Sequence, residues 1–194
     1  MNARQAYAHT HRDLYAEWCS RIESGPSTPA RRMEFAVLSA NAPFGQAVRV
    51  WEDSLDSDPH RAMVANGMGL TTMKTKAIYE IRNAPNDYPK PVPFYSTYRD
   101  TVKHYGLAWS KLSFAACLIA PFESDIVCLD THMVQQYNNY IPNGSWFKSR
   151  FNYRGMENRL RMEARRIEMA PFQYQWAVWD LQRGSQENHD FLWG

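Results

Sequence analysis

Apolar residues recur along this chain at the three- and four-residue spacings of amphipathic helices, whereas the alternation typical of strands is scarce. We therefore predict an all-α protein. The pattern predicts one helix that can begin at Pro43 and a terminal helix opened by Pro171. The pair Asp58-Pro59 is typical of a cap followed by the first helical residue. The other predicted helices span about residues 3–23, 30–41, 59–66, 71–83, 94–104, 110–120, 131–140 and 153–169.

The helical pattern is interrupted most clearly at residues 84–93, which hold four prolines. Proline lacks a backbone N–H and restricts the residue before it, so this stretch is predicted to be an extended loop and the boundary between two lobes. A chain of 194 residues suits a single domain over 1–194. It can bury a sizeable core without disulfides or metals.

Charge is spread unevenly along the chain. The formal net charge is only +2, so the overall balance does not require a nucleic-acid partner. Between Lys148 and Glu168, however, seven residues are basic and three are acidic. This segment could bind phosphates, or it could be a solvated helix face with intrahelical pairs such as Glu157–Arg161.

The cysteines Cys19, Cys117 and Cys128 form no C-x-x-C pair, so neither a zinc site nor a four-cysteine iron–sulfur loop is predicted. Cys117 and Cys128 lie in apolar stretches and are expected to be small core residues. An odd cysteine count without a signal peptide indicates the reducing cytoplasm of a bacterial, archaeal or virus-infected host cell. No apolar run approaches the roughly 20 residues that span a membrane. We expect a monomer without a cofactor.

The candidate chemistry lies at Lys111 and Asp130. Lys111 opens an apolar helical run, and Asp130 stands at the start of the next predicted helix. A nucleophilic amine beside a carboxylate can attack a sugar C1′ and expel a base. Each residue also has a structural interpretation, Lys111 as a solvated residue of a first helical turn and Asp130 as a helix cap.

Four segments in order resemble the helix-hairpin-helix (HhH-GPD) DNA glycosylases, the superfamily of endonuclease III and the oxoguanine glycosylases. They are Val37-Leu-Ser-Ala-Asn41, Met68-Gly-Leu-Thr-Thr-Met-Lys-Thr-Lys-Ala-Ile78, Lys111 as the hairpin lysine, and Asp130-Thr-His132. The resemblance implies a two-lobed helical fold without an iron–sulfur cluster, with the hairpin and catalytic helices at 94–140. It also implies double-stranded DNA as the partner.

The resemblance assigns roles to several residues. Lys111 is expected to be the nucleophile that forms a Schiff base, in a pocket where lost solvation lowers the pKa of the amine. Asp130 is expected to stabilise the developing oxocarbenium ion or to activate the nucleophile, and to cap its helix as well. Asn41 corresponds to the side chain that fills the gap left by a flipped nucleotide, or it is a C-cap before Pro43. His132 is either a structural hydrogen-bonding residue or part of the catalytic site.

The remaining candidates are residues near the expected cleft that could contact a base or the DNA backbone. The family hairpin usually reads Gly-Val-Gly-x-Lys, and its glycines let the backbone approach a DNA phosphate closely. Here it reads Gly106-Leu-Ala-Trp-Ser-Lys111, so the bulky Trp109 stands where the family has a glycine. The candidate contacts to base or DNA are Trp109, Ser110, Tyr137, Arg150 and Arg154, with Lys74, Lys76 and Lys103 as further phosphate contacts.

Three functions are compatible with these residues. The leading hypothesis is a DNA glycosylase/AP lyase that acts on a flipped modified or damaged base, with Lys111 and Asp130 in the roles given above. The second is a phage-type transferase on the same fold that adds an amino acid or amine to a modified thymine. The third is a DNA-binding module without catalysis, which has no need for the carboxylate.

Overall fold

The computed structural model describes residues 1–83 and 108–184, and all regular secondary structure within these ranges is helical. This confirms the predicted all-α class. The helices are α1 (Ala3–Thr10), α2 (Arg12–Ser24), α3 (Pro29–Leu38), α4 (Phe44–Asp53), α5 (Pro59–Ala65), α6 (Thr71–Arg82), α8 (Trp109–Ile119), α9 (Thr131–Asn138), α10 (Gly144–Lys148), α11 (Arg150–Arg165) and α12 (Pro171–Arg183). None of them is long and apolar enough to cross a membrane.

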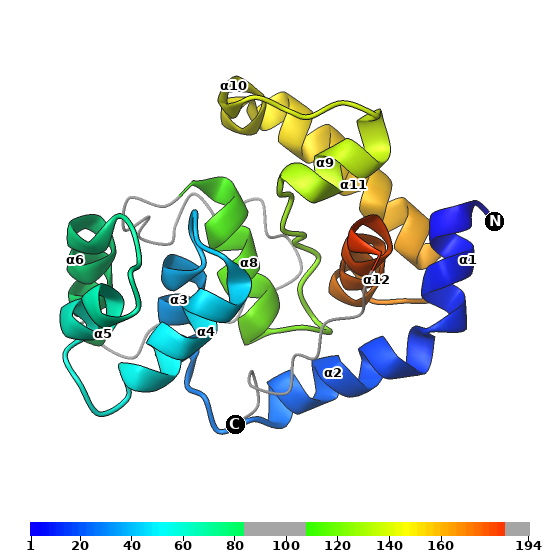
Figure 1. The fold of residues 1–194 in the computed structure, drawn as a ribbon. Coiled ribbons are helices and arrows are strands. Elements are labelled where there is room, and N and C mark those ends of the chain that lie inside the picture. The colour runs from blue at the N-terminus through cyan, green and yellow to red at the C-terminus, as the bar shows by residue number, and fades with distance from the viewer. Residues whose placement is uncertain (84–107, 185–194) are drawn as a thin grey trace.

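The helices pack as two groups, which lie on opposite sides of Figure 1. In the first group α3 packs against α4, α6 and α8, and α5 packs against α4 and α6. Residues 33–38 of α3 are all buried, because neighbours surround this helix on every side.

The second group is built around α12, which packs against α1, α2, α9 and α11. Residues 171–178 are buried without interruption, although they include two glutamines. Helix α2 also packs against α8 and so joins the two groups (Figure 1).

An irregular segment, residues 120–130, leads from α8 to α9 across the molecule. It has no helix or sheet of its own to satisfy its buried backbone groups, so side chains do this. The N–H of Val127 donates to Glu157 Oε1 of α11 at 3.0 Å. The N–H of Leu129 donates to the Tyr153 hydroxyl at 3.0 Å. These bonds set the position at which the chain enters α9.

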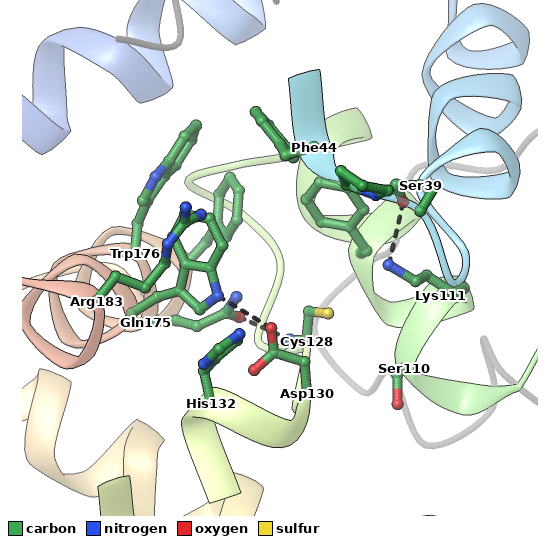
Figure 2. A pocket seen from close by; sticks show the side chains of 15 residues that line it. Ser39, Phe44, Ser110, Lys111, Cys128, Asp130, His132, Gln175, Trp176 and Arg183 are labelled. Carbon is green, nitrogen blue, oxygen red and sulfur yellow. Dashed lines mark hydrogen bonds between the residues drawn. The ribbon is translucent and has the colours of Figure 1, made fainter. Parts of the chain in front are cut away.

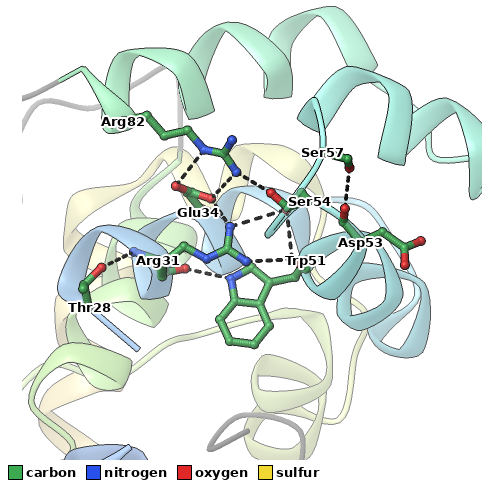
Figure 3. Close-up of polar contacts among 8 residues, drawn as sticks. All are labelled: Thr28, Arg31, Glu34, Trp51, Asp53, Ser54, Ser57 and Arg82. Carbon is green, nitrogen blue, oxygen red and sulfur yellow. Dashed lines mark hydrogen bonds and ion pairs between the residues drawn. The ribbon is translucent and has the colours of Figure 1, made fainter. Parts of the chain in front are cut away.

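A buried cluster of charges ties the first group together (Figure 3). The carboxylate of Glu34 on α3 is 2 % exposed and pairs with two arginines. One is Arg31 of the same helix, and the other is Arg82 of α6, whose guanidinium lies 3.1 Å from the carboxylate. The Arg31 guanidinium also donates to the carbonyl of Trp51 at 2.6 Å, and Arg82 donates to that of Ser54 at 2.9 Å. The cluster therefore links α3, α6 and the end of α4.

Most predicted helices are confirmed, including the Asp58 cap, whose carboxylate accepts from the N–H of Arg61 at 2.9 Å. The single helix predicted over 3–23 is wrong, because His11 separates α1 from α2. His11 Nδ1 contacts the carbonyl of Tyr7 at 2.9 Å and closes α1. The break lets both helices reach α12, a requirement that periodicity along the chain does not reveal.

Two predictions for the basic segment need correction. Its helix begins at Arg150 and ends at Arg165, and the short helix α10 precedes it. Glu157 does not belong to a solvated face, because it is fully buried against Val127. The predicted helix over 94–104 and lobe boundary over 84–93 lie outside the described residues, as does Lys103.

Candidate active site

A cavity of about 440 Å³ lies between the two groups of helices (Figure 2). Its exposed walls are mostly apolar, with several aromatic rings, and polar side chains converge on it, a composition that suits a flat organic ligand. The aromatic lining residues are Phe44, Phe114, Phe172, Trp176 and Trp179. The polar ones are Ser39, Ser110, Lys111, Asp130, His132, Gln175 and Arg183.

Lys111 enters the cavity from the first turn of α8. Its amine donates a hydrogen bond to Ser39 Oγ at 3.1 Å and lies 5.5 Å from the centre of the Phe114 ring. The Ser39 hydroxyl in turn donates to the carbonyl of Ala36 at 2.9 Å, so its lone pairs are free to accept from the amine. Lys111 does lie in the first turn of a helix, but it is only partly exposed and its amine is held at the cavity by Ser39.

Asp130 is fixed through both of its carboxylate oxygens. Oδ1 accepts from the N–H of Met133 at 2.9 Å and caps α9, as the sequence predicted. Oδ2 accepts from the indole N–H of Trp179 on α12 at 2.9 Å (Figure 2). Since each oxygen has only one of these donors, the carboxylate keeps acceptor capacity on the side of the cavity.

A second lysine lies behind Lys111. Lys74 of α6 is fully buried, and its amine donates to the carbonyl of Leu38 at 3.0 Å, one residue before Ser39. Burial, and secondarily the positive charge of Lys111, lowers the pKa of Lys74 to about 8. The expected phosphate contact of Lys74 is therefore wrong, because its amine lies inside the protein at the carboxyl end of α3.

Helix α12 supplies cavity residues that the sequence analysis missed. Phe172, Gln175, Trp176, Trp179 and Arg183 follow one another at helical spacings, so they share one face of the helix. A row of aromatic side chains broken by an amide is the signal that could have identified this face. Periodicity could not show that the face turns toward Lys111.

Trp179 is the centre of contacts in this wall. The Arg183 guanidinium lies 4.4 Å from the centre of its ring, and the His132 ring meets it edge-on at 6.5 Å. Phe44, from the first group of helices, lies 6.2 Å away. These contacts hold the indole in the orientation in which its N–H reaches Asp130.

Asn41 is exposed and adjoins Ala42, one of the lining residues, but does not itself line the cavity. Its φ of +50° lies in the left-handed region, which asparagine tolerates better than most residues. Its alternative interpretation as a C-cap is wrong, because α3 ends at Leu38 with Ser39 in that position.

Three of the expected DNA contacts form a separate group on the surface. The Trp109 ring meets Tyr153 edge-on at 5.8 Å, and the guanidinium groups of Arg150 and Arg154 lie over it at 5.1 and 5.6 Å. Ser110, the next residue, does line the cavity. Trp109 itself is not a lining residue of the cavity.

Tyr137 lies in the core of the second group of helices. Its hydroxyl donates to Glu163 Oε2 at 2.8 Å, and the Arg4 guanidinium covers its ring at 4.1 Å.

All three cysteines are free and buried, as expected for core residues. Within the part of the chain that the structure describes, no three His, Cys, Asp or Glu side chains gather closely enough to hold a metal ion.

No protein-family model matches this sequence, and no curated protein is significantly similar to it in sequence. Two solved structures are similar in fold. One is the Methanocaldococcus jannaschii 8-oxoguanine glycosylase/lyase in complex with a 15mer DNA containing 8-oxoguanine, at a TM-score of 0.74 and 16% identity, covering 91% of this chain and 93% of that one. The other is the 8-oxoguanine DNA glycosylase of the same organism, at a TM-score of 0.73 and 16% identity, covering 95% of each chain. This protein therefore has the helical fold of these glycosylases, as the sequence motifs predicted.

Proposed function

We propose that this protein is a DNA glycosylase with lyase activity that acts on a modified or damaged base turned out of duplex DNA. The observation that carries the proposal is that Lys111 and Asp130 line the same cavity. The shared fold supports it, because the similar Methanocaldococcus jannaschii protein is a glycosylase/lyase whose structure contains DNA with 8-oxoguanine. At 16% identity the fold is shared, whereas the base that is selected can differ.

The proposed reaction begins when a base leaves the stack and enters the aromatic cavity. After losing a proton, the Lys111 amine attacks C1′, the bond from C1′ to the base breaks, and its electron pair leaves with the base, which takes up a proton. Opening of the sugar ring gives a Schiff base, and elimination then cuts the strand. Positive charge develops on the sugar as the base departs, and the Asp130 carboxylate offsets it.

Neighbouring side chains hold the two reacting groups in position. Ser39 accepts a hydrogen bond from the Lys111 amine, and Trp179 donates one to the Asp130 carboxylate. Both supporting residues lie on packed helices or their ends, which favours the fixed geometry that such a reaction needs.

Borohydride trapping on a panel of duplexes with damaged or modified bases tests the proposal. We expect a covalent complex with the wild-type protein on at least one duplex and none with Lys111→Ala. Lys76→Ala is the control for loss of a positive charge: Lys76 is an expected phosphate contact that is exposed on α6 and does not line the cavity, so this variant should still form the covalent complex even if it binds DNA less tightly. An absent complex on every duplex, or an equal one with Lys111→Ala, would refute the lyase reaction.

The same reactions distinguish the other two functions. Mass spectrometry of the nucleosides shows a free base if a glycosylase acts and a heavier, intact nucleoside if a transferase acts. A binding module changes neither, and its affinity for DNA falls with rising salt whether or not Lys111 is present. Double-stranded DNA as partner, the monomeric state and the cytoplasmic location remain predictions.

A further inference from the structure

Gln175 places an amide at the inner wall of the cavity. The residue is only 7 % exposed, lines the cavity and extends from α12 toward Cys128 (Figure 2). The backbone N–H of Cys128 donates to Gln175 Oε1 at 2.6 Å. A backbone N–H can only donate, and the amide nitrogen of a glutamine cannot accept, so this contact settles which end of the amide faces Cys128.

The other end of the amide is available to a ligand. Among the described residues, none accepts a hydrogen bond from Gln175 Nε2, and this nitrogen is not among the side-chain atoms sealed from solvent without a partner. It therefore presents two N–H donors to the cavity. A ligand that displaces water from these donors must supply an acceptor in its place, because a donor left unpaired in the buried complex costs about 1–3 kcal/mol.

The surroundings define the shape of that ligand. Phe44, Phe114, Trp176 and Trp179 line the same cavity, and such rings favour a flat ring as their partner. A ring carbonyl oxygen has two lone pairs and can accept from Nε2. An exocyclic amino group in the same place would point its N–H donors at the N–H donors of Nε2, and no hydrogen bond could form.

We propose that Gln175 makes the cavity selective for bases that carry a ring carbonyl over their amino counterparts. The inference rests on the proposed function, because it concerns the base that this function would remove, and it names the class of that base. The orientation of the amide, fixed by the N–H of Cys128, is what excludes the amino group.

Binding of free bases tests the selectivity without any cleavage. Hypoxanthine and 8-oxoadenine would each be compared with adenine, because the first replaces the amino group by a carbonyl and the second adds a carbonyl. Trp176 and Trp179 line the cavity, so quenching of their fluorescence reports binding. We expect at least one oxo base to bind roughly tenfold more tightly than adenine. Equal affinities, or no binding of any of the three, would overturn the inference.

Gln175→Glu replaces the donor end of the amide by an acceptor and adds a negative charge. One carboxylate oxygen still accepts from Cys128, while the other presents an acceptor where the wild type has donors. We expect the preference for the oxo base to disappear, through a loss of roughly tenfold in its affinity. Gln173→Glu is the matched control, since Gln173 also accepts from a backbone N–H, that of Ala170 at 2.8 Å, but does not line the cavity.

If Gln175→Glu fails to fold, Gln175→Met removes the same donors without adding charge and must also lose the preference. A preference that survives in a folded Gln175 variant refutes the assignment. The outcome is independent of borohydride trapping. A preference that depends on Gln175, without any Lys111-dependent complex, keeps this inference and refutes the proposed reaction. A Lys111-dependent covalent complex together with equal affinities for the oxo base and adenine keeps the proposed reaction and refutes this inference.

Discussion

Burial of the Lys74 amine should reduce the stability of this protein at neutral pH. The amine has one hydrogen bond, to the carbonyl of Leu38, and the positive charge of Lys111 lies near it. Replacing it in Lys74→Met removes a charged group from the interior and keeps a flexible side chain of similar length. We therefore expect the stability of the variant relative to the wild type to be greatest at neutral pH and to fall as the pH rises.

The size of the effect follows from the pKa of Lys74, which falls from an ordinary value of 10.5 to about 8. At about 1.4 kcal/mol per pKa unit this corresponds to about 3 kcal/mol. Below pH 8 the amine is protonated in both the folded and unfolded states, and the folded state bears the full cost. Between pH 8 and 10.5 the unfolded state binds more protons, so the stability of the wild type rises with pH until the cost is gone.

Urea denaturation of wild type and Lys74→Met at pH 7, 8, 9 and 10 measures this difference. Loss of the hydrogen bond to Leu38 costs about 1–3 kcal/mol at every pH, so the informative quantity is the change with pH. The free energy of unfolding of the variant minus that of the wild type should fall by about 2–3 kcal/mol from pH 7 to pH 10. Lys76→Met, at an exposed position on the same helix, should show no such change. A difference that stays constant with pH would refute the reasoning.

Three further outcomes can be measured. Glu34→Ala should lower the free energy of unfolding by about 3–5 kcal/mol, because it leaves two arginines of a buried cluster without their carboxylate; an unchanged urea midpoint would contradict this. Trp179→Phe keeps an aromatic ring but removes the indole N–H that donates to the Asp130 carboxylate, so kcat for base release should fall about tenfold or more with little change in KM. Tyr153→Phe should cost about 1–3 kcal/mol of stability in thermal unfolding, because the N–H of Leu129 loses its acceptor.

The sequence predicted those parts of the fold that depend on short-range patterns. Helices such as α3, α6 and α9 were found because apolar spacing and end signals such as Asp130 act within one or two turns. The break at His11 and the burial of Glu157 were not, because both depend on contacts with helices far away in sequence. Short-range patterns therefore predict where a helix forms but not always where it must turn.

For the site, the sequence alone placed a lysine at the start of one helix and an aspartate at the start of another, and predicted them as the reactive pair. Only the tertiary structure decided which neighbours contact them, since Ser39 reaches Lys111 and Trp179 reaches Asp130 from helices remote along the chain. It also decided that Lys74, close to Lys111 in space, is an internal charge rather than a phosphate contact. The spacing of residues along a helix shows which of them share a face, whereas the packing of the helices determines what that face meets. The energy of a buried charge or amide depends on those surroundings, which only the packing determines.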